Sequence, residues 1–190
     1  MLLGWAPKDN RERFTLDEFV EAFDPNGFQR SNPVFNEDKL KWFSGEYLRE
    51  TNDSKLVKLI YDFYDGKYPE EEISEIVPLV KERIHTLREF ETLGGFFFEE
   101  RDVDESLLEK DNEDHLKDAY LALDGVDDWD KENIDKTLLN MIDKKGYKTG
   151  KFFMNLRIAI TGNKATPPIN ESLVILGKEE TLKRLSRFNK

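Results

Sequence analysis

The chain has 190 residues, of which 38% are hydrophobic and 14 are phenylalanine, enough to fill the core of one domain or of two small ones. It has no cysteine, which excludes disulfides and thiolate metal sites, and no apolar stretch reaches the roughly 18 to 20 residues that a membrane span needs. The formal net charge of −11 argues at first against a nucleic-acid ligand, and the composition as a whole predicts a cytoplasmic globular protein that makes no membrane contact.

The first predicted helix has clear start signals. Thr15 and Glu18 have the spacing of a capping box, and Phe14 and Phe19 have the spacing of a hydrophobic staple. We expect the helix to end at the turn of residues 24–27, which reads Asp-Pro-Asn-Gly.

Further helices follow in close succession. Asn36 begins the second, and a third is expected over about residues 54–64. Apolar residues at spacings of three and four predict a fourth helix over residues 71–92, with Pro78 as a kink or a break and His85 inside the helix.

The second half of the chain opens with residues 93–98, where two glycines precede three phenylalanines. This run is expected to be a packed hinge between subdomains, with the phenylalanines in the core. Residues 99–114 hold nine carboxylates and two basic residues, which indicates a solvated loop or helix face. Two amphipathic helices are predicted near residues 116–123 and 130–142, then a compact unit from residue 148 with two short helices split near Gly177.

These patterns predict an all-α protein, built as a helical bundle. We divide it into three parts, residues 1–50, 51–98 and 99–190. No internal repeat or low-complexity segment interrupts this organisation.

Charge is distributed unevenly along the chain. Residues 143–190 hold 11 Lys and Arg against 4 Asp and Glu, a local charge of +7, while residues 1–142 hold 18 against 36. A basic run of this kind is often only a solvated helix face. The alternative is a surface for RNA on an otherwise acidic body, which would repel a misplaced RNA backbone.

No pattern in the sequence indicates catalysis. His85 and His115 are isolated, and lone histidines are usually structural or exposed. The chain lacks a Gly-rich phosphate loop, a nucleophile elbow and an HExxH pair. We therefore assign no catalytic residue and no metal ligand, and a helical enzyme of unknown chemistry is the weakest of the alternatives.

Three segments together resemble the bacterial-type glutamyl-tRNA synthetases, a family of glutamate–tRNA ligases. The first comprises Leu2-Leu3-Gly4-Trp5, Phe14-Thr15-Leu16 and residues 39–49, KLKWFSGEYLR, in which the family usually has Asn at the place of Ser44. The second is VKERIHTLREF, residues 80–90. The third joins LRIAITG from Leu156, TPPI from Thr166, and LGKE from Leu176. The resemblance implies that residues 1–50 end a stem-contact domain and that residues 51–98 and 99–190 are two anticodon-binding subdomains.

The resemblance also implies a site. Arg83 matches the arginine that reads the third anticodon base, and Arg157, Thr166, Pro167 and Ile169 match positions that cradle unstacked anticodon bases. This chemistry suits single-stranded loops, whose bases are bound by apolar or planar platforms and edge hydrogen bonds. Two alternatives remain open: Arg83 paired with Glu82 or Glu89, and Thr166 to Ile169 as an ordinary rigid turn. Lys148, Lys151 and Lys164 are expected as phosphate contacts.

The expected function is therefore recognition of the anticodon arm of glutamate tRNA by a monomer that binds no DNA. The family's HIGH-like and KMSKS-like motifs, which activate glutamate with ATP and magnesium, do not occur here. We expect a chain that is inactive alone and binds no cofactor, either an excised C-terminal part or a separately encoded module. The alternatives are a relaxed specificity that includes glutamine tRNA, and a protein-interaction adapter of the same fold whose residues 99–114 dock a basic partner.

Overall fold

A computed structural model describes residues 4–9, 11–28 and 34–188; Leu2 and Leu3 of the first motif lie outside the described residues. Over these ranges the chain forms nine α-helices and three short 3₁₀ helices, and its one β-bridge joins Trp5 and Phe28. The prediction of an all-α helical protein is confirmed. By its internal contacts the chain divides into two compact units, residues 1–41 and 42–190.

The first unit is organised around Trp5, which is buried. Helix α1 (Leu16–Ala22) begins with the predicted capping box, in which the Thr15 hydroxyl accepts from the Glu18 amide at 3.2 Å and the Thr15 amide donates to the Glu18 carboxylate. Phe19 contacts Trp5 edge to face, with ring centroids 5.2 Å apart. The 3₁₀ turn η1 (Pro25–Gly27) follows, as predicted for the end of this helix.

Helix α2 (Glu37–Glu50) spans the boundary between the units. Its start is fixed by Asn36, whose side-chain oxygen accepts from the Lys39 amide at 2.9 Å. This confirms the start predicted from the sequence.

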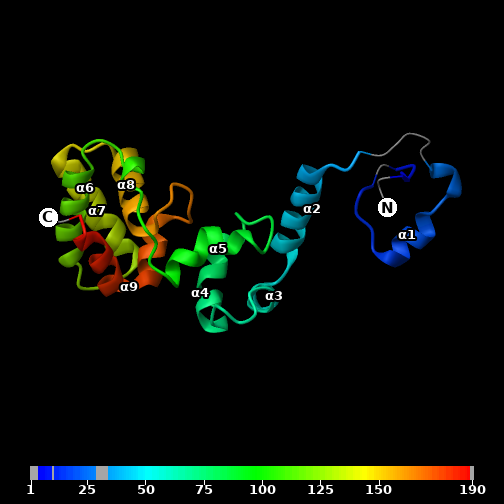
Figure 1. Ribbon diagram of the computed structural model, residues 1–190, viewed down its shortest axis with the longest axis horizontal. Coiled ribbons are helices and arrows are strands. Elements are labelled where there is room, and N and C mark those ends of the chain that lie inside the picture. Colours follow the sequence, from blue (N-terminus) through cyan, green and yellow to red (C-terminus); the bar gives the residue numbers. More distant parts are fainter. Residues whose placement is uncertain (1–3, 10, 29–33, 189–190) are drawn as a thin grey trace. The chain divides into compact units, whose positions relative to one another are not determined.

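Helices α3 (Asp53–Phe63), α4 (Glu70–Val80) and α5 (Glu89–Gly94), with the 3₁₀ turn η2 (Gly95–Phe97), form the first group of the second unit (Figure 1). Their apolar faces share one core, and Phe97 and Phe98 pack against it. Phe96 is buried as well, so the predicted packing of the three phenylalanines is confirmed. The most buried members of the core include Leu56, Ile60, Ile73, Val77, Ile84 and Phe90.

The prediction of one helix over residues 71–92 is wrong. Helix α4 ends at Val80, two residues after Pro78, and residues 81–88 form turns before α5 begins. Proline removes one helical hydrogen bond and crowds the preceding turn, which weakens the helix at this point. His85 therefore lies in the connection, where its amide donates to the Glu89 carboxylate at 2.6 Å.

The second group comprises the 3₁₀ turn η3 (Glu105–Leu107) and helices α6 (Asn112–Asp124), α7 (Lys131–Lys145), α8 (Thr149–Thr161) and α9 (Ile169–Ser186). Figure 1 shows α6 to α9 as one bundle, and they share a second core. Gly177, with φ of 77°, interrupts α9 and produces the predicted split. Core residues include Leu116, Leu123, Ile134, Leu138, Phe152, Leu156 and Leu185.

The two groups of the second unit are in contact. Helix α9 packs on α4, and Ile175 of α9 contacts the first core. The subdomain boundaries at residues 50 and 98 stay predictions.

Candidate nucleic-acid interface

Arg83 is presented by the turn that follows α4. The amides of Arg83 and Ile84 both bond to the Val80 carbonyl, at 2.8 and 3.1 Å. Val80 and Ile84 are fully buried, which fixes the turn to the core and leaves Arg83 exposed. Within the described residues Arg83 makes no ion pair and no side-chain hydrogen bond, so the geometry gives no support to a pairing with Glu82 or Glu89.

Arg157 lies on α8, a helix whose surroundings are mostly apolar. Its neighbours Leu156 and Ile158 are fully buried, and the helix is hydrophobic on most of its circumference. A helix of this kind belongs inside a bundle, which makes a charged residue on it unusual. The Arg157 side chain is half-buried, and its Nε is shielded from solvent without a hydrogen-bond partner among the described residues.

The structure brings the two arginines together from the two helical groups. Burial lowers the pKa of the Arg157 guanidinium, and the positive charge of Arg83 lowers it further. In the part of the chain that the structure describes, no carboxylate acts to raise the pKa of Arg157. A partly desolvated guanidinium without a carboxylate partner, such as that of Arg157, offers strong donors to an acceptor edge or an anion.

The other three predicted base contacts have a place in the protein's own packing. Thr166 and Pro167 are buried, and the Thr166 hydroxyl donates to the Pro167 carbonyl at 3.1 Å. Ile169 is 4% exposed and belongs to the second core. These positions match the interpretation as a rigid turn at least as well as direct base contact, and their role in binding stays a prediction.

The turn after α8 is tied to Arg157 by short polar contacts. The Thr161 hydroxyl donates to the Arg157 carbonyl at 2.8 Å and accepts from the Asn163 amide at 3.1 Å. The Asn163 side chain in turn accepts from the Ala165 amide at 3.3 Å. The path from Arg157 to the Thr-Pro-Pro turn is therefore held by side-chain hydrogen bonds as well as by backbone.

Five of the ten described cations in residues 143–190 pair with carboxylates in the fold. Lys151 pairs with Glu109 at 3.5 Å, Lys145 with Asp118 at 2.9 Å, and Arg187 with Glu100. Arg184 is buried and donates to the Ile160 carbonyl at 2.9 Å. Lys183 pairs with the Glu100 carboxylate, and Lys178 donates to the Asp124 carbonyl.

The basic end is therefore only partly neutralised, and its expected role in orienting the RNA stays a prediction. Glu100 and Glu109, carboxylates of the stretch expected to be solvated, supply partners from within the chain. Lys148 and Lys164 are exposed, and neither forms an ion pair among the residues the structure covers. Of the three predicted phosphate contacts, only Lys151 is engaged with a carboxylate in those ranges.

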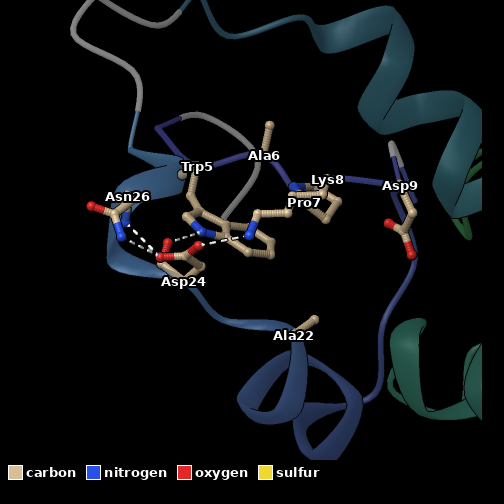
Figure 2. Close-up of a pocket in the computed structure, with 9 residues that line it drawn as sticks. Trp5, Ala6, Pro7, Lys8, Asp9, Ala22, Asp24 and Asn26 are labelled. Atoms are coloured by element: carbon tan, nitrogen blue, oxygen red, sulfur yellow. Dashed lines mark hydrogen bonds and ion pairs between the residues drawn. The ribbon is translucent and has the colours of Figure 1, made fainter.

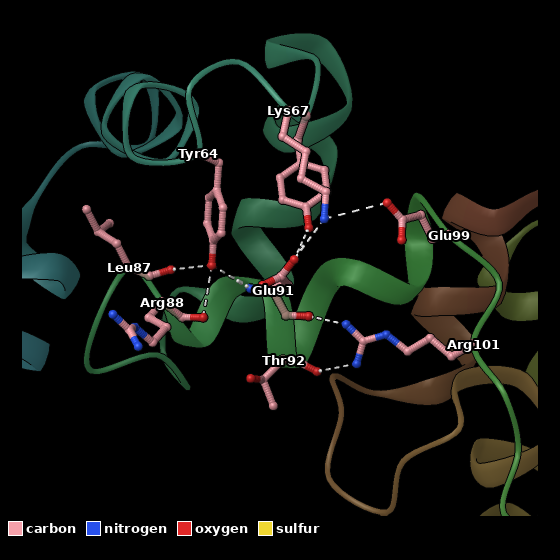
Figure 3. A network of polar contacts seen from close by, with 9 residues as sticks. Tyr64, Lys67, Leu87, Arg88, Glu91, Thr92, Glu99 and Arg101 are labelled. Atoms are coloured by element: carbon pink, nitrogen blue, oxygen red, sulfur yellow. Dashed lines mark hydrogen bonds and ion pairs between the residues drawn. The ribbon is translucent and has the colours of Figure 1, made fainter.

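A polar network behind the Arg83 segment was not expected from any sequence pattern (Figure 3). The Tyr64 hydroxyl donates to the Arg88 carbonyl at 2.9 Å and accepts from the Glu91 amide at 3.2 Å. The Glu91 carboxylate accepts from Lys67 at 2.9 Å and from the Tyr68 hydroxyl at 2.8 Å, contacts that lower its pKa. The network fixes the end of the connection that carries Arg83 against α3 and α5.

His115 is structural, as expected for a lone histidine. It is 3% exposed, and its Nδ1 lies 3.0 Å from the Asn155 side-chain nitrogen. Burial lowers its pKa, which favours the neutral ring. The Asn155 oxygen accepts from the Glu109 amide at 2.7 Å, so the pair also anchors the start of the second bundle.

A groove lies beside Trp5 in the first unit (Figure 2). Its polar groups are already satisfied: the Asp24 carboxylate accepts from the Asn26 amide at 2.9 Å and pairs with Lys8 at 3.2 Å. In the described ranges no group of side chains is arranged to hold a metal ion, and no helix there is long and apolar enough to cross a membrane.

Residues 46–189 match the model of a protein family described as the anticodon binding domain. This range includes α3 to α9 and both arginines. The chain belongs to the anticodon-binding domain family. The prediction of family from the three sequence segments is confirmed.

The similar proteins are glutamate–tRNA ligases. The chain is 32% identical to the enzyme of Clostridium acetobutylicum over 195 residues, and the alignment covers 97% of this chain and 40% of that protein. It is 34% identical to an enzyme of Thermus thermophilus over 194 residues, and that alignment covers 98% of this chain and 42% of the relative. A crystal structure of a glutamate tRNA ligase from Elizabethkingia meningosepticum in complex with its amino acid superposes with a TM-score of 0.80 at 25% identity, covering 99% of this chain and 39% of that chain. The anticodon-binding chain thus spans about two fifths of the length of these relatives.

Proposed function

We propose that this chain recognises the anticodon arm of glutamate tRNA as part of a glutamate–tRNA ligase, and that it acts as a monomer in the cytosol, where tRNAs are used. The observation that carries the proposal is the half-buried Arg157, whose Nε has no hydrogen-bond partner in the described ranges and whose guanidinium lies in the field of the exposed Arg83, in a chain of the anticodon-binding family. In this assignment Arg83 reads the edge of the third anticodon base, and Arg157 stacks on or bonds to a neighbouring unstacked base. Each such contact contributes about 1 to 3 kcal/mol.

The test is binding of the purified chain, at low salt, to anticodon stem-loops of glutamate tRNA that carry each of the four bases at the third anticodon position. We expect a preference for cytosine that the variant Arg83→Ala abolishes. Lys110→Ala is the matched control, because it removes an exposed positive charge from the linker before α6. That variant should bind more weakly at most by a small factor and keep the preference.

The outcomes separate the alternatives. Equal binding of all four stem-loops would leave a general RNA clamp and would contradict the role of Arg83. Equal binding of a glutamine tRNA stem-loop would indicate relaxed specificity. If no stem-loop binds, the adapter becomes the better hypothesis, although Glu100 and Glu109 of its expected docking region are paired within the chain.

We also propose that activation of glutamate requires parts of a ligase that this chain does not include, and that ATP, glutamate and magnesium do not bind here. A rise in melting temperature with these three ligands together would contradict this proposal, because a ligand that binds the native state stabilises it by mass action.

A further inference from the structure

The segment between the two helical groups contains one arginine, Arg101, in a stretch dominated by carboxylates. Its guanidinium donates to the carbonyl of Glu91 and, at 3.4 Å, to the carbonyl of Thr92 (Figure 3). These carbonyls belong to the short helix α5, whose C-terminal end favours a cation; the Glu91 carbonyl also accepts from the Gly95 amide. The side chain of Arg101 is therefore attached to the first group.

The backbone at Arg101 is attached to the second group. A Cβ atom placed on Gly162 would lie 2.9 Å from the Asp102 carbonyl oxygen and 3.3 Å from the Cβ of Arg101. Gly162 has φ of 70°, a conformation that favours glycine, so the turn after α8 is shaped to let this segment approach. Arg101 thus bridges α5 and the turn after α8.

Both ends of this bridge lead to an arginine of the proposed site. On one side Glu91 bonds through the Tyr64 hydroxyl to the Arg88 carbonyl, at the end of the connection that carries Arg83. On the other side Gly162 follows Thr161, whose hydroxyl donates to the Arg157 carbonyl.

Gly95 supplies an independent sign that the bridge is built into the fold. A Cβ atom on Gly95 would collide with the Arg101 Nη2. The backbone of Gly95 is helical, with φ of −61° and ψ of −24°, so its conformation does not call for glycine. A side chain at this position would instead force the flexible end of Arg101 to move away.

We propose that Arg101 is a positioning residue that holds the two helical groups in the one orientation in which Arg83 and Arg157 address the same RNA loop. This inference rests on the proposed function. The like charges of Arg83 and Arg157 oppose their approach. The Arg101 bridge acts beside the packing of α9 on α4 to maintain it. Without the bridge the aligned state is populated less, and apparent affinity falls by the same factor.

The experiment uses three variants of the full chain. Arg101→Gln removes the bridge, Arg101→Lys restores one charged donor, and Gly95→Ala displaces the guanidinium without changing the charge. Lys110→Gln controls for the loss of a linker charge, and Gly150→Ala controls for the added methyl group, because a Cβ there meets nothing within 4 Å. Each is measured for binding of the cytosine-bearing stem-loop of glutamate tRNA.

A second readout reports the orientation directly. The chain has no cysteine, so spin labels can be placed at Glu75→Cys on α4 and Asn140→Cys on α7, both exposed positions. We expect Arg101→Gln and Gly95→Ala to broaden the distribution of label distances without RNA and to weaken binding about tenfold. Arg101→Lys should recover part of both, and the two controls should match the wild type.

The failures can be told apart. If the wild type binds no stem-loop, the proposed function fails and the positioning role falls with it. If the wild type binds while Arg101→Gln binds equally well with an unchanged distance distribution, only the positioning role is refuted. If Arg101→Gln weakens binding with unchanged distances and Gly95→Ala has no effect, Arg101 contacts RNA itself and the positioning role is again refuted.

Discussion

Replacing Arg157 by methionine should stabilise the free protein and weaken RNA binding by about tenfold or more. The Arg157 Nε is shielded from water without an acceptor in the described ranges, and the guanidinium lies in the field of Arg83. Methionine keeps an unbranched apolar stem of similar length among the same neighbours, so little packing is lost. The variant therefore removes two unfavourable contributions to the free energy of folding.

The magnitude follows from these two contributions. A buried donor without a partner costs about 1 to 3 kcal/mol, and the lower end applies because the side chain is only half-buried. Repulsion from an exposed cation adds a few tenths, about the size of a surface ion pair with the opposite sign. We expect the free energy of unfolding to rise by about 1 kcal/mol, which moves a urea midpoint by roughly 0.5 M.

Urea unfolding followed by far-UV circular dichroism measures this change. Arg83→Met is the matched control, because it removes the repulsion from an exposed position and should change stability by less than about 0.5 kcal/mol. A loss of stability in Arg157→Met would show that the guanidinium makes favourable contacts in the free protein. That result would refute the argument that its desolvated charge is held ready for a ligand.

Three further predictions concern the scaffold. Burial lowers the pKa of His115 below the usual 6.5, so the unfolded chain binds a proton at this residue more readily than the folded chain. The free energy of unfolding should therefore fall as the pH drops below about 6.5. His115→Gln should make this fall smaller between about pH 7.5 and 5.5. Gly162→Ala should lower the free energy of unfolding in urea by about 2 kcal/mol or more, because Gly162 has a positive φ and its added Cβ would lie 2.9 Å from a carbonyl oxygen. Gly150→Ala, whose Cβ meets no atom within 4 Å, should raise it by about 0.4 to 1 kcal/mol. Equal effects of the two substitutions would contradict this argument. Tyr64→Phe removes the hydroxyl that holds the Arg83 segment and should lower stability by about 1 kcal/mol and weaken stem-loop binding, while unchanged binding would show that the segment is held without it.

Helix starts could be predicted from the sequence because their causes are local. Thr15 and Asn36 cap the helices that follow them, through contacts only three residues away. The same holds for the split of α9 at Gly177, where one residue with positive φ interrupts the helix. The end of α4 could not be placed in this way, because Pro78 permits either a kink or a stop, and the stop depends on Ile84 packing into a core built from distant residues.

The candidate site needed more than local pattern. Composition and spacing do not show that Arg83 and Arg157, 74 positions apart, approach each other, and only the family resemblance singled them out. The ion pairs of the basic region were hidden for a similar reason. The partners of the pairs Glu100 with Arg187 and Glu109 with Lys151 lie far apart in the chain, and a count of charges along the sequence cannot reveal them.

These ion pairs change how an acidic protein is expected to bind RNA. If the local charge of +7 were free, many phosphate contacts would form and affinity would fall steeply with salt. With five of the region's ten described cations paired to carboxylates, Arg83, Arg157, Lys148 and Lys164 are the predicted contacts that remain for the RNA, and the arginines are assigned to bases. If the two lysines each contact one phosphate of a single-stranded loop, the slope of log affinity against log salt concentration should be about −1.4. If both arginines contact phosphates as well, the slope should be no steeper than about −3. A steeper slope in the stem-loop titration would mean that the ion pairs open on binding. An affinity independent of salt would show that the lysines do not contact phosphates.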